Sequence, residues 1–480
     1  MISVITENIK TIIAIAAIGV FLFFIGIGSC QKDGFFSASP NYISEPGEEL
    51  SGGATTVFDQ SVNAFALPAP QLSSADELLF FVGNSFFNQN WVQSPSSTTS
   101  RDGLGPYFNT RSCSGCHFKD GRGQPQATIG EMSQGFIVRL SATGIGQHGE
   151  PLADLNYGTQ FHDHAIEGVK TEGKFELIYE EISGYYPDGT TFSLRKPKIN
   201  FTELNYGPLG DGVMHSARVA PQMIGLGLLE AIPEQTILNF ADESDANDDG
   251  ISGKPNYVWN TIEQKTEMGR FGWKANQPTI LQQIAAAFNG DMGITTKYFK
   301  EQNIESSQIE YKNLPNGGEP EIEDDDLEKM LLYSSTLAVP ARRDIDDKNV
   351  LEGKKIFKEI GCNGCHIEKI QTGTHPQFSV LSDQTIRPFT DLLLHDMGDG
   401  LADGRPDFLA SGSEWRTPPL WGIGLFQTVN KHTFYLHDGR ARNLEEAILW
   451  HGGESENSKK EFMQLSKPER EKLLSFLESL

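Results

Sequence analysis

The chain has 480 residues and carries 64 acidic against 39 basic side chains, for a formal net charge of −25 at pH 7. This length is enough for two or more domains. The strong negative charge argues against binding to nucleic acid and against direct adsorption to anionic lipid. Basic or small partners fit the charge, although acidity also serves to keep an exported protein in solution.

An apolar run, Thr11–Gly28, stands near the start of the chain. Its length lies between the core of a secretory signal, about 7 to 15 residues, and a membrane span of about 20. The run ends in "IGSC", which resembles a bacterial lipobox. We therefore expect a signal peptide over 1–29, a lipid on Cys30 and a flexible polar tether over 30–70. An uncleaved anchor is the alternative. Either anchor would hold the folded part of the chain at a membrane of the bacterial envelope, in the periplasm or at the outer surface.

Helical and strand patterns alternate along the rest of the chain. A helix is expected from Ser74, which has capping-box spacing with Glu77 and precedes apolar residues at helical intervals. Short strand-like runs separated by Gly, Asp and Pro predict a partly β insertion at about 130–205. Ser466 and Glu469 form a second capping-box pattern, which predicts a terminal helix.

Two C-x-x-C-H motifs use four of the five cysteines: Cys113, Cys116 and His117 in the first, and Cys362, Cys365 and His366 in the second. A C-x-x-C pair alone also occurs in redox dithiols and zinc sites. A zinc ribbon would need both pairs on one metal, although they stand 249 residues apart (362 minus 113). A dithiol does not need a histidine directly behind it. The motifs therefore predict two covalently attached haems c.

Two further patterns support cytochrome-like halves. Apolar residues at helical spacing precede the second motif in "VLEGKKIFKEIGCNGCH", as is typical of class I cytochromes c. "PQMIGLGL", residues 221–228, and "PPLWGIGL", residues 418–425, share P-x-x-x-G-x-G-L at an offset of 197 residues (418 minus 221). This internal echo favours a duplicated domain.

Longer motifs carry a family resemblance. "RTPPLWGIG" followed by "YLHDGRARNLEEAILWHGG" resembles the C-terminal signature of the bacterial di-haem cytochrome c peroxidase and MauG superfamily. "RDGLGPYFNTRSCSGCH", "RVAPQMIGLGLLEAIPE" and "GRFGWKA" are similar to its di-haem oxidoreductase branch. We therefore expect a mainly α-helical fold of two cytochrome c-like haem domains. The N-terminal one spans 71–340 with the partly β insertion, and the C-terminal one spans 341–480.

The resemblance implies residues around the second haem. In the peroxidases, a methionine fourteen residues beyond the histidine of an H-D-G motif ligates the electron-transferring haem. Here H-D-G begins at His437 and the fourteenth residue is His451, which is the expected ligand. Met397 is the alternative. His437 is expected beside the haem or a propionate, and Arg416 and Arg440 are candidates to neutralise propionates.

The first haem has no clear ligand opposite His117. Four histidines are candidates without a matched motif: His148, His162, His164 and His215. Peroxide activation requires an open sixth position and a group that moves a proton between the peroxide oxygens. The peroxidases use a glutamate in a segment that this chain lacks. The nearest equivalents are Glu230 and Glu234, of which Glu234 is alternatively a first-turn residue that complements a helix dipole.

A short acidic segment, "DANDDGISGKPN", has the spacing of a calcium loop. Three side chains offer oxygens at positions 1, 3 and 5: Asp245, Asn247 and Asp249. The carbonyl of Ile251 would follow. Asn256 stands where a bidentate glutamate normally closes the shell, so an acidic turn without metal is the alternative.

Together these patterns predict a di-haem oxidoreductase of peroxidase type. The C-terminal haem would pass electrons from a donor cytochrome or other redox protein to the N-terminal haem, where peroxide or another small oxidant reacts. Two alternatives stay open. One is a non-enzymatic electron-transfer cytochrome with both irons six-coordinate, and the other is MauG-like oxidation of an organic or protein substrate.

Overall fold

The computed structural model describes residues 43–126 and 133–480. The predicted signal peptide and Cys30 lie outside these residues. Within them, no helix combines the length and the apolar character needed to cross a membrane.

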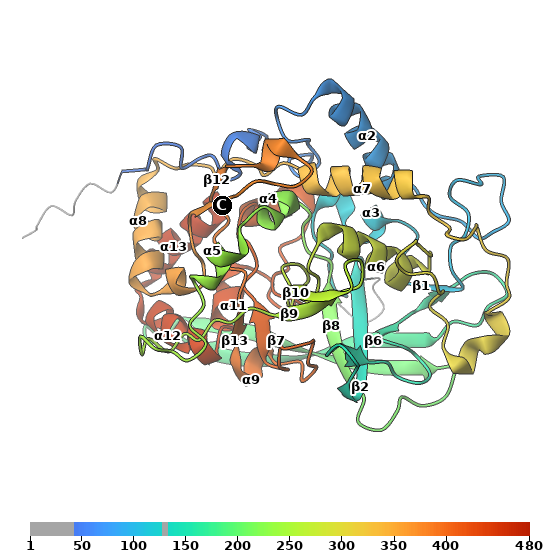
Figure 1. Cartoon of the computed structure of the whole chain (residues 1–480). Helices are drawn as coiled ribbons and strands as arrows, with labels where there is room; N and C mark the ends of the chain where they lie inside the picture. Colours follow the sequence, from blue (N-terminus) through green and yellow to red (C-terminus); the bar gives the residue numbers. More distant parts are fainter. Residues whose placement is uncertain (1–42, 127–132) are drawn as a thin grey trace, which may run out of the picture. The chain divides into compact units, whose positions relative to one another are not determined.

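Residues 44–70 pack onto the rest of the described chain (Figure 1). Phe65 is fully buried, and Val57 and Pro68 form bridges to Pro340 and Leu337. The unit that contains this segment runs from Ser44 to Leu480. Residues 44–70 of the predicted tether therefore belong to the folded unit. The division into domains at 340/341 stays a prediction.

The long periodic segments form helices where the sequence predicted them. The first is α2 (Ser74–Asn88), which Ser73 caps by accepting the N–H of Asp76 at 3.1 Å. The cap is thus one residue earlier than predicted. The capping box of Ser466 and Glu469 is present at the start of α13 (Lys467–Ser479).

Helix α8 (Lys348–Glu359) precedes the second C-x-x-C-H motif and packs against α13. The two helices approach so closely that a Cβ on Gly353 would lie 2.0 Å from the carbonyl oxygen of Lys472. The rings of Phe357 and Phe476 lie 5.1 Å apart beside this crossing. This is the arrangement expected of the terminal helix of a cytochrome c fold.

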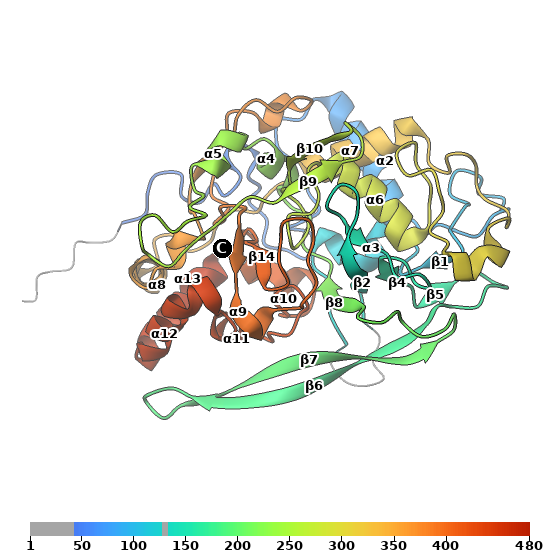
Figure 2. The same cartoon turned by 60° about the horizontal axis from the view of Figure 1, so that its bottom comes forward.

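Strands occupy most of the segment in which a β insertion was predicted. Strand β2 (Phe136–Ile145) pairs with β3 (Pro151–Leu152), β4 (Gln160–Phe161) and β8 (Met214–Val219). Strands β6 (Gly173–Tyr185) and β7 (Thr191–Leu204) form a separate antiparallel ribbon (Figure 2).

Further helices and short paired strands complete the fold. The remaining α-helices are α3 (Cys113–Cys116), α4 (Leu226–Glu230), α5 (Glu234–Leu238), α6 (Ile280–Met292), α7 (Asp324–Thr336), α9 (Gly398–Leu401), α10 (Phe426–Val429), α11 (Leu444–Leu449) and α12 (Glu456–Gln464). The remaining strands form four pairs: β1 (Tyr107–Phe108) with β5 (His164–Ala165), β9 (Tyr257–Asn260) with β10 (Lys265–Met268), β11 (Ile370–Gln371) with β12 (Thr385–Ile386), and β13 (Leu394–Asp396) with β14 (Glu414–Arg416).

The prediction of a mainly α fold was wrong. Helices account for 29% of the described residues and strands for 20%, in several small antiparallel sheets. Strands β11 to β14 lie in the half that was expected to be a helical haem domain. Each is only two or three residues long, which is too short to leave a period-two pattern in the sequence.

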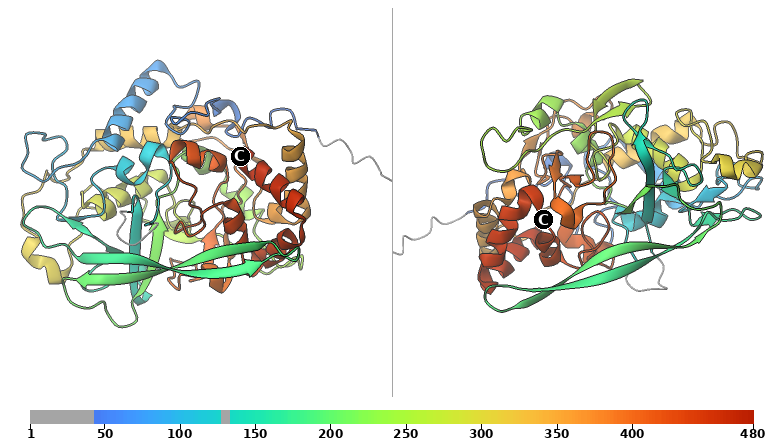
Figure 3. Two further views of the ribbon diagram at one scale, coloured as in Figure 1. Left: turned by 180° about the vertical axis from the view of Figure 1, so that it is seen from behind. Right: turned by 90° about the horizontal axis from the view of Figure 1, so that it is seen from below.

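The β6–β7 ribbon reaches from the first half of the chain to the C-terminal helices (Figure 3). At its tip, Tyr186 is buried with the guanidinium of Arg470 3.7 Å from its ring centroid. The Tyr186 hydroxyl donates to Glu445 at 2.7 Å, and Asp188 pairs with Arg470 at 2.9 Å. The ribbon therefore fastens the two halves of the chain together.

Replacing Tyr186 with phenylalanine is expected to lower the free energy of unfolding by about 0.5–1.5 kcal/mol, because one hydrogen bond is lost while the ring packing stays. Urea unfolding measures the change. Tyr185→Phe is the matched control, since that side chain is 75% exposed, and it should have no effect. Equal stability of both variants would contradict a fastening role for the Tyr186 hydroxyl.

Candidate functional site

Each C-x-x-C-H motif lines its own cavity. The first cavity, of about 210 Å³, is lined by the first motif and by side chains of α6 and of the segment around Trp273. The second, of about 200 Å³, is lined by the second motif and by residues from α11 and α13. The lining of both is mainly apolar. The duplicated motifs thus sit at two separate sites of similar size.

The two motif histidines are held alike. His117 donates from Nδ1 to the carbonyl of Pro221 at 2.7 Å, and His366 donates from Nδ1 to the carbonyl of Phe389 at 3.0 Å. This leaves each Nε2 with a free lone pair. Burial lowers the pKa of both, for His366 to about 4. Both are therefore neutral at pH 7, as metal ligation by imidazole requires.

The second cavity contains both residues predicted to ligate opposite His366. His451 donates from Nδ1 to the carbonyl of Ala447 at 2.8 Å, so its Nε2 is also free. Burial lowers the pKa of His451. Met397 lines the same cavity, with the Ser455 hydroxyl 3.9 Å from its sulfur. The identity of the sixth ligand stays a prediction.

The first cavity differs from the second in the histidines that line it. Among the described residues, His117 is the only histidine that lines it. The four histidines considered as its partner all lie elsewhere: His148, His162, His164 and His215. Three methionines do reach the lining: Met223, Met292 and Met330. The described lining of the first site therefore has no second imidazole.

Glu230 and Glu234 do not line either cavity. Glu230 accepts the backbone N–H of Ile280 at 2.8 Å, and Glu234 accepts the Tyr257 hydroxyl at 3.3 Å. Both lie close to Arg270, which does line the first cavity. Burial lowers the pKa of Arg270, and the charges of the two glutamates partly offset this effect. Their catalytic role stays a prediction, and the structure gives them no direct contact with the cavity.

A thin wall separates the two cavities. Five residues line both: Gln222, Trp273, Arg416, Pro418 and Pro419. The Trp273 indole is fixed by donating to the carbonyl of Val219 at 2.8 Å. Groups bound in the two cavities would thus face opposite sides of the same few side chains.

The internal echo lies in this wall. Gly225 and Gly422, which correspond across the offset of 197 residues, both have left-handed backbone conformations, with φ of 71° and 78°. A Cβ on Gly225 would lie 2.4 Å from Trp421, and one on Gly422 would lie 2.7 Å from Ile224. Ile224 and Trp421 also correspond across the offset. The contact is therefore reciprocal, as around a local two-fold axis.

Two buried guanidinium groups in the second cavity lack a counter-ion among the residues that the structure describes. Arg416 donates to the carbonyls of Gly272 and Thr417, and Arg122 donates to the carbonyl of Leu436. Over the ranges 43–126 and 133–480, neither has a carboxylate within 4.0 Å. Burial lowers the pKa of each to about 10. A buried unpaired cation is costly, so these groups fit a ligand that brings its own carboxylates, as a haem does with its propionates.

The other residues predicted around the second haem have distinct surroundings. His437 lines the second cavity and stacks on Trp415, with ring centroids 3.6 Å apart. Burial lowers the pKa of His437 to about 3, so it is neutral. Arg440 lines neither cavity and pairs with Asp438 at 2.7 Å. This carboxylate takes the place of the propionate proposed for Arg440.

In the predicted calcium loop, side-chain oxygens accept hydrogen bonds from backbone N–H groups of the same loop. Asp245 accepts the N–H of Gly250 at 3.1 Å, and Asn247 accepts the N–H of Asp249 at 2.9 Å. Asn256, at the closing position, is fully buried and donates to backbone carbonyls of the core. It is thus turned away from the loop. Calcium binding through Asp245, Asn247, Asp249 and Ile251 stays a prediction.

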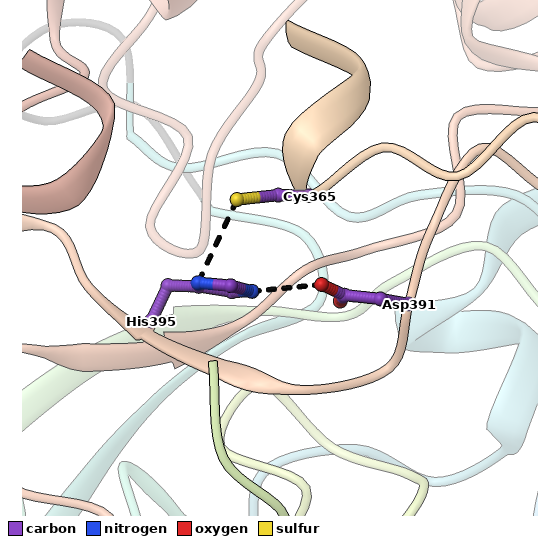
Figure 4. A group of neighbouring side chains, drawn as sticks. All are labelled: Cys365, Asp391 and His395. Carbon is purple, nitrogen blue, oxygen red and sulfur yellow. Dashed lines mark hydrogen bonds and ion pairs between the residues drawn. The ribbon is translucent and has the colours of Figure 1, made fainter. Parts of the chain in front are cut away.

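Sequence reasoning missed a buried cluster in the wall of the second cavity. His395 donates from Nε2 to Asp391 at 2.8 Å and from Nδ1 to Glu454 at 2.7 Å, and Nδ1 lies 3.6 Å from the sulfur of Cys365 (Figure 4). Burial alone would lower the pKa of His395, but these hydrogen bonds outweigh it and raise the pKa well above its usual range. Cys365, Asp391 and His395 are close enough to suggest a metal site. Both ring nitrogens of His395 already donate hydrogen bonds, so neither is free to bind a metal. Asp391, His395 and Glu454 form a cluster of ion pairs instead.

Sequence reasoning also missed Trp273 and Arg122, which stand between or beside the cavities. Trp273 belongs to "GRFGWKA", a segment already matched to the family, so the resemblance did carry a signal. Arg122 and His395 both stand close to residues that the sequence did single out, Arg122 after the first motif and His395 before Met397, but no motif pointed to either side chain.

Two similar cavities, each with two cysteines and a neutral histidine and divided by a shared wall, define a protein that holds two redox groups side by side. A family model described as "Di-haem oxidoreductase, putative peroxidase" matches residues 47–139 and 151–480. Because the match covers most of the chain, this protein belongs to the di-haem oxidoreductase family. Its cofactors are accordingly two haems. A search of curated proteins finds no match to the chain.

Proposed function

We propose that the protein is a peroxidase-like oxidoreductase in which the second haem passes electrons to a reactive first haem. The asymmetry of the two cavities supports this assignment. His451 and His366 both line the second cavity, whereas the first cavity has His117 and no other described histidine. A six-coordinate iron suits electron transfer, and an open iron suits reaction with an oxidant.

The side chains that line the two cavities supply binding and orientation. Bound haem would provide an iron that exchanges single electrons with peroxide or another small oxidant. Cys113 and Cys116 would attach the first haem, and Cys362 and Cys365 the second. Arg416 would bind propionates, and the shared wall would keep the two haems close without a water layer.

Optical and EPR spectra before and after hydrogen peroxide test the assignment. We expect one low-spin haem, and one high-spin haem whose spectrum changes with peroxide in the half-reduced protein. Two low-spin haems that peroxide leaves unchanged would instead identify an electron-transfer cytochrome. Oxidation of an added organic or protein substrate with the same oxidant would indicate the MauG-like alternative.

The predicted glutamates are tested by Glu230→Gln, Glu234→Gln and the double variant. Loss of a group that moves protons typically costs 10²- to 10⁴-fold in rate. We expect a smaller loss of peroxide turnover, about tenfold, since both carboxylates act on the cavity through Arg270. Haem content is measured in parallel to exclude loss of cofactor. Full activity of the double variant would remove both residues from the mechanism.

The electron donor and the location are also proposals. The net charge of −25 favours a basic cytochrome or similar redox protein, whose association should slow as salt screens the attraction. A lipid on Cys30 would hold the protein at a membrane of the bacterial envelope. Mass spectrometry of the mature N-terminus tests the lipid.

A further inference from the structure

The buried cluster beside Cys365 holds its charges in fixed positions. The side chains of His395, Asp391 and Glu454 are 3%, 2% and 10% exposed. Each carboxylate also accepts backbone N–H groups, from Leu393 at Asp391 and from Asp396 at Glu454. Despite burial, the hydrogen bonds from His395 and Asp396 hold the pKa of Glu454 below its ordinary value. The cluster therefore contains two negative groups and one positive group.

The cluster belongs to the wall of the second site only. His395 and Glu454 line the second cavity, and neither lines the first. The contact between His395 and Cys365 brings the cluster to the sulfur that would carry the haem. Its net charge of about −1 is buried, so water and salt screen it weakly. A charge in this position acts mainly on the second haem.

We propose that Asp391, His395 and Glu454 lower the reduction potential of the second haem. A net negative charge stabilises the oxidised iron, which is the more positive state. A lower potential makes the second haem a better donor to the first. This inference rests on the proposed function, because it gives the second haem the role of relay.

The test removes the negative charges while keeping the side-chain volumes. Asp391→Asn and Glu454→Gln each remove one carboxylate, and the double variant removes both. The double variant lowers the negative charge whether or not His395 then keeps its proton. A unit charge roughly 10 Å from a redox centre changes its equilibrium roughly tenfold at an effective dielectric constant of about 20. Tenfold corresponds to about 59 mV for one electron.

Spectroelectrochemical titration of the haem-loaded protein measures both potentials. We expect the second haem to rise in potential by about this amount in each single variant and by at least as much in the double variant. The first haem serves as an internal reference and should not move. Asp396→Asn is the matched control, because this neighbouring carboxylate is exposed and water screens its charge.

An unchanged second potential in the double variant, with both haems attached and the circular dichroism of the parent protein, would overturn the proposal. If the double variant does not fold, the potential of Glu454→Gln, the most exposed position of the three, decides in the same way. Peroxide reactivity of the first haem is measured separately. A shifted potential without peroxide reaction would support the effect of the cluster on the second haem and refute the relay to a peroxidase site. Peroxide reaction without a shift would refute the cluster alone.

Discussion

Replacing Arg416 with methionine should destabilise the haem-loaded protein by about 3–5 kcal/mol, because it removes one partner of a buried ion pair. Arg416 is buried, lines both cavities and has no carboxylate partner in the described chain. We infer that its counter-ions are haem propionates. Loss of a cation beside both haems should also lower both reduction potentials.

Urea unfolding and redox titration of the same preparation separate these effects. Arg440→Met is the matched control, since Arg440 is also buried but pairs with Asp438 and lines neither cavity. It should destabilise the protein and leave the potential of the first haem unchanged, because neither Arg440 nor Asp438 lines the first cavity. If Arg416→Met behaves like Arg440→Met in the titration, Arg416 does not bind propionates.

Replacing His451 with alanine should convert the second haem from low-spin to high-spin. The side chain faces the same cavity as His366 and presents a free Nε2, so its removal leaves the iron without a sixth protein ligand. EPR of the oxidised protein resolves the change, and the signal of the first haem should stay as it was.

Met397→Leu is the control for this prediction. It keeps most of the side-chain volume in the second cavity and removes the thioether sulfur. The second haem should remain low-spin. The reverse pattern, with a spin change in Met397→Leu and none in His451→Ala, would assign the ligand to Met397.

The parts of the site that local sequence predicts are those built from consecutive residues. The C-x-x-C-H motifs, helix α8 before the second motif and the terminal helix α13 all follow from spacing along one segment. The position of His451 followed from a motif fourteen residues away. In each case, the residues that decide the structure are neighbours in the chain.

The remaining parts depend on contacts between distant segments. Arg122 and His437 share a cavity although they stand more than three hundred residues apart, and Glu454 reaches His395 from 59 residues away. Glu230 shows that closeness in sequence is not sufficient, because it belongs to a matched motif and yet lines neither cavity. It ends α4 and accepts an N–H at the start of α6 instead. Only the packed chain decides which side of a short helix faces a ligand.

The prediction of a mainly α fold was wrong for a related reason. Hydrophobic periodicity reports long helices well and two-residue strands hardly at all. The sequence predicted strands in the ribbon of β6 and β7, but it did not predict that the tip of the ribbon packs against the C-terminal helices.

The contact between the ribbon tip and the C-terminal helices has a consequence for biosynthesis. The tip residue Tyr186 leaves the ribosome 259 residues before its partner Glu445. Until then the tip of the ribbon has no surface against which to bury Tyr186, and nothing holds the edges of this two-stranded sheet in place; exposed edges invite pairing with other chains. The nascent protein is therefore most prone to aggregate while its last third is being made. A chain that stops before α11 would stay in that state.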